Sequence, residues 1–539
     1  MQQESGSQFS TLFERALHAA QNKSLAAAIE LFDGAIRLEP SNAAAHCNRG
    51  TVLLELNELH AALASYDRAV TLKADYAVAY CNRGNVLRKL RRWDEALVSY
   101  DRANEINPLH AEVHCNRGNV LRELNQLDEA LCSYNDAIRL NPQLAEAYSN
   151  RGTVLCLLQQ FDAALASYDR AIAINPRYAE AYCNRGLLLH DLGGYPAALD
   201  SYARALAVRP DFAEARLNRS MTLLALGDFA NGWSEYEWRW RTELFSGERR
   251  PFTQPLWLGK DSLAGKTILL HGEQGFGDML QFCRYSTLLA ELGATVILLV
   301  PGPLKSLLAS ADGVARCVGP TEALPEFDYH CPLMSLPLAF NSTLNSLPAQ
   351  VPYLRGNAEK TLRWKEKLGP RRKPRIGLVW SGGVRPNQPD LWHVNRRRNI
   401  PLATLAVLLR PDMEFYSLQK GELAEAELRE FAVKNSGAPE LIALTDELRD
   451  FSDTAALVAN LDLIVTVDTA MAHLAAALGK PVWILNRFDA CWRWLVDRSD
   501  SPWYPTVKLY RQRRPGDWEG VMRQVAADLA HIAARGRFD

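Results

Sequence analysis

The first half of the chain repeats one pattern of apolar and polar positions with a step of 34 residues. Within one unit, Ala62, Tyr66 and Ala69 place apolar side chains at helical spacing. Gly50 is a small residue at the point where two paired helices would approach each other. Most units end in a proline, which ends the second helix because proline cannot continue the hydrogen-bond ladder. The aromatic column is Tyr66, Tyr100, Tyr134, Tyr168, Tyr202 and Tyr236, and the proline column is Pro40, Pro108, Pro142, Pro176 and Pro210.

An Asn-Arg-Gly tripeptide recurs with the same step and strengthens the assignment of a repeat. It occurs at Asn48, Asn82, Asn116, Asn150 and Asn184, and at Asn218 a serine replaces the glycine. These columns resemble the tetratricopeptide repeat, in six to seven units over residues 9–241. The resemblance implies an α-helical superhelix with a concave inner face.

The arginine of the tripeptide differs from the usual residue of that repeat, and two interpretations are open. Arg49 and its equivalents could contact a ligand directly, or they could pair with carboxylates in the second helices. Asp67, Asp101 and Asp169 are the candidate partners. We favour the ion pairs, because a buried arginine normally needs a partner.

The asparagine column is the candidate site for binding an acceptor. One asparagine in each repeat would face the groove, and its amide offers both donors and an acceptor to a peptide bond. The column resembles the asparagine ladder of O-GlcNAc transferases, which holds extended protein substrates. The alternative is that the amides bridge neighbouring repeats. The candidate acceptor-binding residues are Asn48, Asn82, Asn116, Asn150, Asn184 and Asn218.

The period stops after Arg241, and strands then alternate with helices, which indicates parallel sheets. We expect a linker over residues 242–264, one Rossmann-like half over 265–358 and a second over 359–535. The strands are predicted at 267–270, 295–300, 314–318, 327–333, 375–380, 415–419, 441–445, 463–467 and 482–485. A last helix at about 518–532 is expected to cross back to the first half.

Three loops at the ends of predicted strands carry candidate chemistry, because ligands bind beyond the carboxyl ends of strands in such sheets. The turn Gly275-Phe276-Gly277-Asp278 places a carboxylate at a helix start, although a plain tight turn also explains it. Ser381, Gly382 and Gly383 form a loop suited to backbone contact with phosphate. Arg396, Arg397 and Arg398 precede Pro401, and guanidinium groups bind diphosphate well.

The segment from Asp468 to Ala477 is the most specific of these motifs. Asp468 and Thr469 begin a helix of small residues, whose amino end favours phosphate. His473 taken alone is more often a structural histidine than a catalyst. We expect Trp492, Trp494, Trp503 and Tyr504 to be packed in a core.

Together the motifs resemble GT-B glycosyltransferases, nearest to the heptosyltransferase-like family 9 and its tetratricopeptide-fused bacterial relatives. The resemblance implies that Asp278 is the general base, that Arg398 contacts donor phosphate, and that the helix start near Asp468 lines the donor site. Ala470 and Arg398 depart from the family's usual glycine and lysine. The expected donor-binding residues are Gly275, Gly277, Ser381, Gly382, Gly383, Arg397, Arg398, Gln419, Asp468, Thr469, Ala470 and His473.

The composition of the chain excludes some classes of protein. The formal charge of -1 excludes a broadly basic nucleic-acid binder. No apolar run reaches the roughly 18 residues of a membrane span, and the polar start lacks a signal sequence, so we expect a cytoplasmic protein. The ten cysteines have no metal-binding spacing, and we expect free thiols and no metal.

The resemblance implies an inverting glycosyltransferase, and we expect it to be metal-independent, with no cofactor beyond its nucleotide-activated donor sugar. The resemblance suggests a protein acceptor modified on Ser or Thr, with flagellin as one candidate, recruited by the repeats. One alternative is a repeat scaffold with a degenerate transferase domain. The other is a sugar transferase that acts on lipopolysaccharide.

Overall fold

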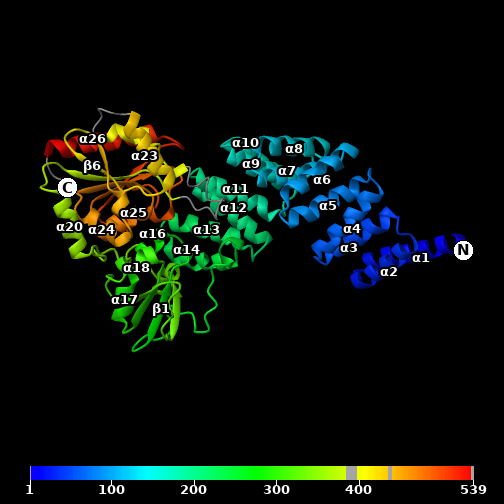
Figure 1. Cartoon of the computed structure of the whole chain (residues 1–539), viewed down its shortest axis with the longest axis horizontal. Helices are drawn as coiled ribbons and strands as arrows, with labels where there is room; N and C mark the ends of the chain where they lie inside the picture. The colour runs from blue at the N-terminus through cyan, green and yellow to red at the C-terminus, as the bar shows by residue number, and fades with distance from the viewer. Residues whose placement is uncertain (1, 384–396, 435–439, 536–539) are drawn as a thin grey trace. The chain divides into compact units, whose positions relative to one another are not determined.

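The computed structural model describes residues 2–383, 397–434 and 440–535 (Figure 1). The chain forms two compact units, and each is described by itself. The first comprises Met1–Leu188 with Ala207–Arg209, and the second comprises Leu189–Leu206 with Pro210–Asp539. The boundary between the units lies inside the repeats, so the last helix pairs belong to the same unit as the sheets.

The first unit is built of consecutive antiparallel helix pairs. Each second helix ends close to the residue that the sequence pattern indicates: α6, for example, ends at Ile106, two residues before Pro108. The helices are α1 (Gln2–Gln21), α2 (Leu25–Leu38), α3 (Ala43–Glu55), α4 (Leu59–Leu72), α5 (Ala77–Lys89), α6 (Trp93–Ile106), α7 (Ala111–Glu123), α8 (Leu127–Leu140), α9 (Ala145–Leu157), α10 (Phe161–Ile174) and most of α11 (Ala179–Asp191).

The repeated glycine and tyrosine pack directly on each other inside each pair. A Cβ atom added to Gly84 would lie 2.7 Å from a ring carbon of Tyr100, and one added to Gly50 would lie 2.9 Å from the ring of Tyr66. Both distances are shorter than a normal carbon contact. The glycine is therefore required so that the first helix can lie on the tyrosine ring, as the sequence predicts.

Four arginines of the column form ion pairs of the predicted kind, and Arg151 bonds to Asn135 instead. Arg83 donates to Asp67 in the second helix of the preceding unit at 2.7 Å, and to Ser99 in its own second helix at 2.7 Å. Asp33, Asp101 and Asp169 accept in the same way from Arg49, Arg117 and Arg185. The arginines are only partly buried, with side chains 21–28% exposed. These arginines link each repeat to the preceding one.

The second unit begins with the last repeat helices. These are the end of α11, α12 (Tyr195–Val208), α13 (Ala213–Ala225), α14 (Phe229–Tyr236), the 3-10 helix η1 (Glu237–Arg241) and the short α15 (Glu243–Ser246). The segment expected to be a linker packs against the first sheet: Leu256 bridges to His330, and Trp257 is buried.

The first sheet has four parallel strands in the order β3-β2-β1-β4. Its strands are β1 (Thr267–His271), β2 (Thr295–Leu299), β3 (Val314–Val318) and β4 (Tyr329–Pro332). Its helices are α16 (Phe276–Phe282), α17 (Tyr285–Glu291), α18 (Gly302–Leu308) and α19 (Leu336–Ala339), with the 3-10 helix η2 (Leu333–Ser335). The chain order reverses between β1 and β4, so the carboxyl ends of these two strands flank a switch point, where ligands bind in α/β sheets.

The second sheet has six parallel strands in the order β10-β9-β8-β5-β6-β7. Its strands are β5 (Arg375–Val379), β6 (Glu414–Ser417), β7 (Leu441–Ala443), β8 (Leu463–Val467), β9 (Val482–Asn486) and β10 (Val507–Arg511). Its helices include α20 (Ala358–Leu368), α22 (Leu402–Leu405), α23 (Glu422–Lys434), α24 (Phe451–Ala459), α25 (Ala470–Ala477) and α26 (Trp518–Arg535). Here the switch point lies between β5 and β8. The fold class is confirmed: helical repeats precede an α/β region with two parallel sheets, consistent with GT-B.

Two expectations about the end of the chain have different outcomes. The four aromatic residues Trp492, Trp494, Trp503 and Tyr504 are buried in the main core, as expected. The last helix, α26, was expected to cross back to the first half. Its buried side chains Val521, Met522, Val525 and Leu529 instead pack in the core of the second sheet. Strand β10, which the sequence pattern did not reveal, provides part of that surface through Tyr510.

Candidate functional site

The loops that follow β1 and β8 lie against each other. A Cβ atom added to Gly277 in α16 would lie 2.8 Å from Cδ2 of His473 in α25, and 3.6 Å from Cα of Ala470. Small residues on both helices thus permit their close approach. Two motifs that are almost 200 residues apart in sequence, one from each Rossmann-like half, therefore form one site.

Asp278 lies at the start of α16, and both of its carboxylate oxygens are engaged. Oδ2 accepts a hydrogen bond of 2.8 Å from the backbone N–H of Gly275 and so caps the helix. Oδ1 pairs with the guanidinium of Arg493, which comes from the second half. The tight-turn interpretation of this motif is thus partly correct, because Asp278 stabilises the turn. Each carboxylate oxygen has a second lone pair for a further donor.

Arg493 is a buried cation held among several groups. Its Nε donates to Oε1 of Gln281 at 2.8 Å, and its guanidinium stacks 4.2 Å from the centre of the Trp492 ring. Burial disfavours the charge, but Asp278, Cys491 and Tyr236 together outweigh burial and raise the pKa of Arg493. Arg493 therefore remains charged and fixes the direction of the Asp278 carboxylate.

His473 is a structural residue at this junction. Its Nδ1 lies 2.9 Å from the hydroxyl of Tyr504, and its ring stacks on Trp494 with centroids 5.4 Å apart. Burial, with the charges of Arg493 and Arg284, holds the pKa of His473 well below its ordinary value. The ring is therefore neutral at neutral pH, and its packing fixes α25 against α16.

The loop after β5 is held by amide side chains. Oε1 of Gln419 accepts from the backbone N–H groups of Trp380 at 3.1 Å and Ser381 at 2.9 Å. The N–H of Gly382 donates to Oδ1 of Asn399 at 2.8 Å. Gln419 was expected at the donor site, and the structure gives it a role in shaping the loop. Gly383 follows at the exposed end of this loop.

Arg398 connects this loop to the loop after β8. Its guanidinium packs on Gly382, where a Cβ atom would clash with it, and its Nη1 donates to the backbone oxygen of Asp468 at 3.1 Å. Thr469 caps α25 by accepting from the N–H of Met471 at 3.3 Å. Arg398 and the amino end of α25 thus lie together at the switch point of the second sheet, which is the usual position for a phosphate.

Arg397 points to other partners. Its Nη1 lies 3.0 Å from Oδ2 of Asp191 in α11 and 2.8 Å from Oδ2 of Asp489 after β9. Two carboxylates thus accept from the guanidinium that was expected to bind the donor diphosphate. Arg396, the first residue of the predicted basic run, lies outside the described residues.

A second carboxylate, Glu273, lies in the loop after β1. Its side chain is fully buried and pairs with Arg239 of η1, whose Nη2 is 3.1 Å from Oε1. Burial raises the pKa of Glu273 to about 7, although Arg239 acts in the opposite direction.

The asparagine column contains bridges between repeats. Nδ2 of Asn116 donates to Oδ1 of Asn85 at 3.1 Å, and Nδ2 of Asn150 donates to Oδ1 of Asn119 at 2.8 Å. Two of the six candidate residues therefore bond to the preceding repeat, as the bridging interpretation expects. Asn48, Asn82, Asn184 and Asn218 are all partly buried like these two.

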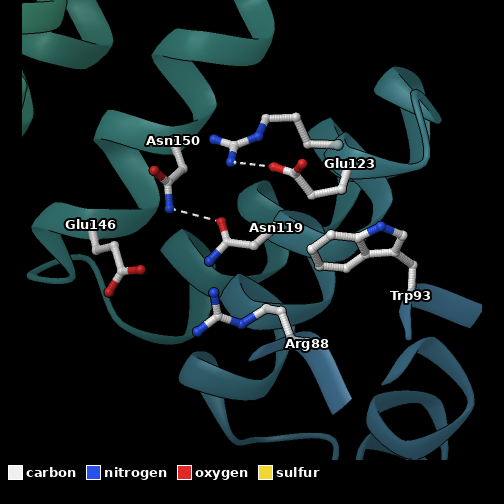
Figure 2. A pocket seen from close by; sticks show the side chains of 7 residues that line it. Arg88, Trp93, Asn119, Glu123, Glu146 and Asn150 are labelled. Carbon is white, nitrogen blue, oxygen red and sulfur yellow. Dashed lines mark hydrogen bonds and ion pairs between the residues drawn. The ribbon is translucent and has the colours of Figure 1, made fainter. Parts of the chain in front are cut away.

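Asn119 and Asn150 also line a pocket of about 190 Å³ in the first unit (Figure 2). Figure 2 shows their amides pointing towards each other, with Arg88 and Glu146 beside them. Arg122, Glu123 and Trp93 complete the lining. Arginine and glutamate side chains both line the pocket, so it carries charges of both signs.

Three residues beside the predicted motifs are not among the predicted site residues: Arg493 pairs with Asp278, Gln281 accepts from Arg493, and Arg239 pairs with Glu273. Gln281 lies one turn after Asp278 on α16, so helical spacing could have indicated it. Arg493 and Asp278 are 215 residues apart, and Arg239 precedes the sheets. A local motif carries no signal for such a contact.

Three properties of the described residues bear on the chemistry. All ten cysteines lie in the described ranges, and none of them forms a disulfide there. Within those ranges, no group of three or more His, Cys, Asp or Glu side chains is placed to hold a metal ion. The described helices include none with the length and apolar character needed to span a membrane.

Comparison with known proteins finds family matches in both halves of the chain. Residues 429–485 match the glycosyltransferase family 9 (heptosyltransferase). Tetratricopeptide repeat families match 50–91, 118–158 and 152–193, with further matches at 77–109, 99–131 and 183–236. The chain thus carries tetratricopeptide repeats followed by a family 9 glycosyltransferase-like domain.

Individual relatives share parts of the chain. It is 29% identical over 334 residues to Protein FlbA of Caulobacter vibrioides, a match that covers 57% of this chain and 53% of FlbA. The chain thus spans about half the length of that curated relative. Among solved structures, it is similar to YrrB, described as a TPR protein with an unusual peptide-binding site (29% identity, 34% of this chain and 95% of YrrB, TM-score 0.30). A tetratricopeptide repeat protein from Parabacteroides merdae is also similar (21% identity, 43% and 91% covered, TM-score 0.39).

Proposed function

We propose that this protein is a glycosyltransferase that moves a sugar from a nucleotide-activated donor to a protein acceptor. The observation that carries the proposal is the contact between Gly277 at the start of α16 and His473 in α25. This contact places a carboxylate, Asp278, beside the amino end of a small-residue helix at the edge of two parallel sheets. The match to family 9 covers part of the second half and supports the same assignment.

Asp278 is the proposed general base. As the acceptor hydroxyl oxygen forms its bond to the anomeric carbon, the carboxylate takes the hydroxyl proton. The bond from that carbon to the donor phosphate oxygen breaks, and the nucleotide leaves with the bonding electrons. Attack on the face opposite the leaving group inverts the anomeric carbon. General-base help of this kind accelerates a reaction by about 10²–10⁴-fold.

The leaving phosphate is proposed to lie at Arg398 and the amino end of α25. A guanidinium binds phosphate oxygens bidentately, and the unpaired N–H groups of a helix start favour an anion. Both lie at the switch point between β5 and β8. These groups supply the charge that a divalent metal would otherwise provide, so we propose a metal-independent reaction.

The repeats are proposed to bind the acceptor protein. Where Asn150 donates to Asn119, its own Oδ1 remains available as an acceptor, and Nδ2 of Asn119 remains as a donor. The Asn116–Asn85 pair leaves the same two groups, and a donor beside an acceptor matches the C=O and N–H of an extended peptide. We propose Ser or Thr as the modified residue and flagellin as a candidate acceptor, which follows from the resemblance to fused relatives.

Calorimetry on the full chain tests the donor site. The probes are UDP-, GDP-, dTDP- and CMP-sugars, each titrated with and without EDTA. We expect one class to bind equally well in both buffers, and Arg398→Ala to weaken that binding. Strict dependence on added magnesium or manganese contradicts the metal-free mechanism. Binding of none of these sugars supports a scaffold with a degenerate domain.

Intact-mass measurement of cellular proteins tests the acceptor. Deletion of the gene should remove a mass increment of one or more sugars from at least one protein. A change confined to lipopolysaccharide contradicts the protein-acceptor proposal and supports the lipopolysaccharide transferase.

A further inference from the structure

The segment that follows the last repeat helix contacts the loop that leads into α16, the helix of Asp278. This segment, Tyr236–Arg241, comprises the end of α14 and the 3-10 helix η1. The loop after β1 runs from Gly272 to Gly275, and its residues Glu273 and Gln274 each bond to one side chain of the segment. Both elements belong to the second unit.

Arg239 is the centre of these contacts and is completely buried. Its Nη1 donates to Oε1 of Glu237 at 2.6 Å, and its Nη2 donates to Oε1 of Glu273 at 3.1 Å and to Oγ of Ser335 at 2.7 Å. The guanidinium also lies over the ring of Trp240, 4.4 Å from its centre. Ser335 follows β4, so Arg239 touches the ends of both strands that flank the switch point of the first sheet.

Tyr236 holds the next residue of the loop. Its hydroxyl accepts from Nε2 of Gln274 at 2.7 Å. Two consecutive loop residues are therefore fixed from one side, and the following residue, Gly275, donates its N–H to the carboxylate of Asp278. A displacement of Glu273 or Gln274 would thus be passed along three residues of backbone to the candidate base.

The ion pair is incompletely satisfied, which a purely structural pair would avoid. Oε2 of Glu273 and Nε of Arg239 are buried and have no hydrogen-bond partner in the described part of the chain. Two carboxylates, Glu237 and Glu273, also share the one guanidinium. A buried polar atom without a hydrogen-bond partner destabilises the folded state, because it has lost its bonds to water. Such a cost is typical of positions where a functional arrangement is maintained.

We propose that Arg239 and Tyr236 are positioning residues of the transferase centre, which hold the Glu273–Asp278 loop in the geometry that its chemistry requires. The expected effect of these residues on transfer rests on the proposed function. The expected effect on the position of the loop does not. The segment Tyr236–Arg241 thus supports the loop at the end of β1 as well as ending the repeats.

Hydrogen exchange on the full chain without ligand tests whether the segment holds the loop. Tyr236→Phe removes only the hydroxyl that accepts from Gln274, and Arg239→Lys keeps a charge but loses the forked geometry. Arg239→Met loses both charge and geometry. We expect faster exchange in a peptide covering 272–282, in the order Met above Lys and Phe. Arg219→Met is the matched control, because Arg219 pairs with Glu235 in the same last repeat and does not contact the loop.

Kinetics test whether the loop geometry matters for transfer. The readout is nucleotide release from whichever sugar of the UDP-, GDP-, dTDP- and CMP-linked panel the wild type uses. We expect Arg239→Met to lower kcat by roughly 10- to 100-fold with KM for the donor nearly unchanged, since a small misplacement of a catalytic group has effects of this size. Arg239→Lys should recover part of the rate.

The outcomes separate the two proposals. If the wild type releases nucleotide from no donor, the proposed function fails, and exchange in the 272–282 peptide still decides whether the segment holds the loop. If Arg239→Met and Tyr236→Phe are folded with wild-type exchange, the inference is wrong. It is also wrong if exchange rises while kcat stays at the wild-type value, because the loop position then has no catalytic consequence.

Discussion

The arginines of the repeats and those of the transferase region form ion pairs of different kinds. In the repeats, four arginines with side chains 21–28% exposed pair with aspartates that are 38–57% exposed, always 16 residues away. In the second unit, Arg239 and Arg493 have side chains 0% and 9% exposed, and their partners Glu273 and Asp278 are 34 and 215 residues away. The first kind is repeated and exposed to water, and the second is unique and buried.

The stability of the repeats is therefore distributed over many similar ion pairs, whereas that of the transferase region depends on single ion pairs. An exposed pair contributes little, about 0–1 kcal/mol, because water screens it. Breaking a buried pair leaves an uncompensated charge and costs about 3–5 kcal/mol. The repeats should therefore tolerate the loss of any one arginine, whereas the transferase region should not. The predictions below test this contrast, beginning with the largest expected effect.

Asp278→Asn should lower transfer by about 10²–10⁴-fold while donor binding changes little. Asparagine keeps the shape of the side chain, but it cannot take a proton. Turnover and calorimetric donor affinity, measured on the same preparation, check the prediction. Near wild-type turnover would show that the base lies elsewhere, and Glu273 would be the next candidate.

Asp278 also caps α16, so a control for the cap is needed. Asp450 caps the start of α24 from the N-cap position, where its Oδ1 accepts from the N–H of Asp453 at 2.8 Å. Asp450→Asn should leave turnover unchanged and lower the melting temperature less than Asp278→Asn, which also leaves the buried charge of Arg493 without its carboxylate. Equal losses of turnover in both variants would mean that the cap, rather than the base, matters.

Arg493→Met should reduce the free energy of unfolding of the second unit by about 3–5 kcal/mol. The matched change in the repeats, Arg117→Met, should reduce that of the first unit by less than about 1 kcal/mol. Urea unfolding of the full chain measures both. Tryptophan emission reports mainly on the second unit, because Trp93 is the one tryptophan of thirteen outside it. Circular dichroism reports on all helices.

A loss of the same size in both variants would remove the contrast between the two regions. The double variant Arg493→Met with Asp278→Asn sharpens the test. With the charges of both partners removed, stability should partly recover relative to Arg493→Met alone, since no uncompensated carboxylate remains.

Mild acid should destabilise the second unit more than the repeats. Burial holds the pKa of His473 well below its ordinary value and lowers the pKa of His271 to about 3. The unfolded chain binds these protons below about pH 6.5, so the stability they contribute is complete above that pH and is lost as pH falls. Each histidine accounts for up to about 2 kcal/mol between pH 6.5 and 5. Tryptophan emission should therefore melt earlier at pH 5 than at pH 7.5, with a smaller change in the repeats' circular dichroism.

Glu273 changes stability with pH in the opposite direction to the two histidines, and replacing it isolates its contribution. Its folded pKa of about 7 lies above the unfolded value, so its contribution is present below about pH 4.5 and is lost as pH rises through 7. Glu273→Gln removes this offset. Its stability should fall more steeply than that of the wild type as pH drops from 7 to 5. Parallel pH profiles would show that Glu273 keeps an ordinary pKa.

The sequence predicts the periodic parts of the molecule well and the unique contacts poorly. The Gly84–Tyr100 packing and the Arg83–Asp67 pair follow from a period that many units repeat. The strand-end motifs also indicate where a site should be, because parallel strands bring their carboxyl ends to one edge. No such rule predicts the contact of Asp278 with Arg493. It depends on how the two sheets meet, and the pattern of a single segment does not contain that information.

Arg397 and β10 show two further limits. Arg397 is adjacent to Arg398 in a basic run, and sequence treats them alike, yet one contacts Asp468 and the other Asp489. The direction of a side chain depends on tertiary neighbours. Strand β10, Val507–Arg511, carries two charged residues in five and lies at the sheet edge, so its apolar run is too short to be recognised.

The smallest predicted effect concerns single asparagines of the repeats. Asn150→Ala removes the bond to Asn119 and should lower the stability of the first unit by about 0.5–1.5 kcal/mol. No hydrogen bond from the side chain of Asn184 is found within the described ranges, so Asn184→Ala should leave melting unchanged. If the column binds an extended acceptor, Asn184→Ala should still weaken acceptor binding by a similar free energy, since one amide partner is lost.

Measuring melting temperature and acceptor affinity on both variants separates the two tasks of the column. If the asparagines only bridge repeats, Asn184→Ala should change neither melting temperature nor acceptor affinity. Asn150→Ala should then lower acceptor affinity only as far as it lowers stability. Peptide binding predicts that Asn184→Ala keeps its melting temperature and loses affinity. Combining Asn82→Ala with Asn184→Ala should then roughly add the two losses, because these residues lie three repeats apart and share no partner. Unchanged affinity in that combined variant would eliminate the asparagine groove and leave the repeats to bind the acceptor by another face.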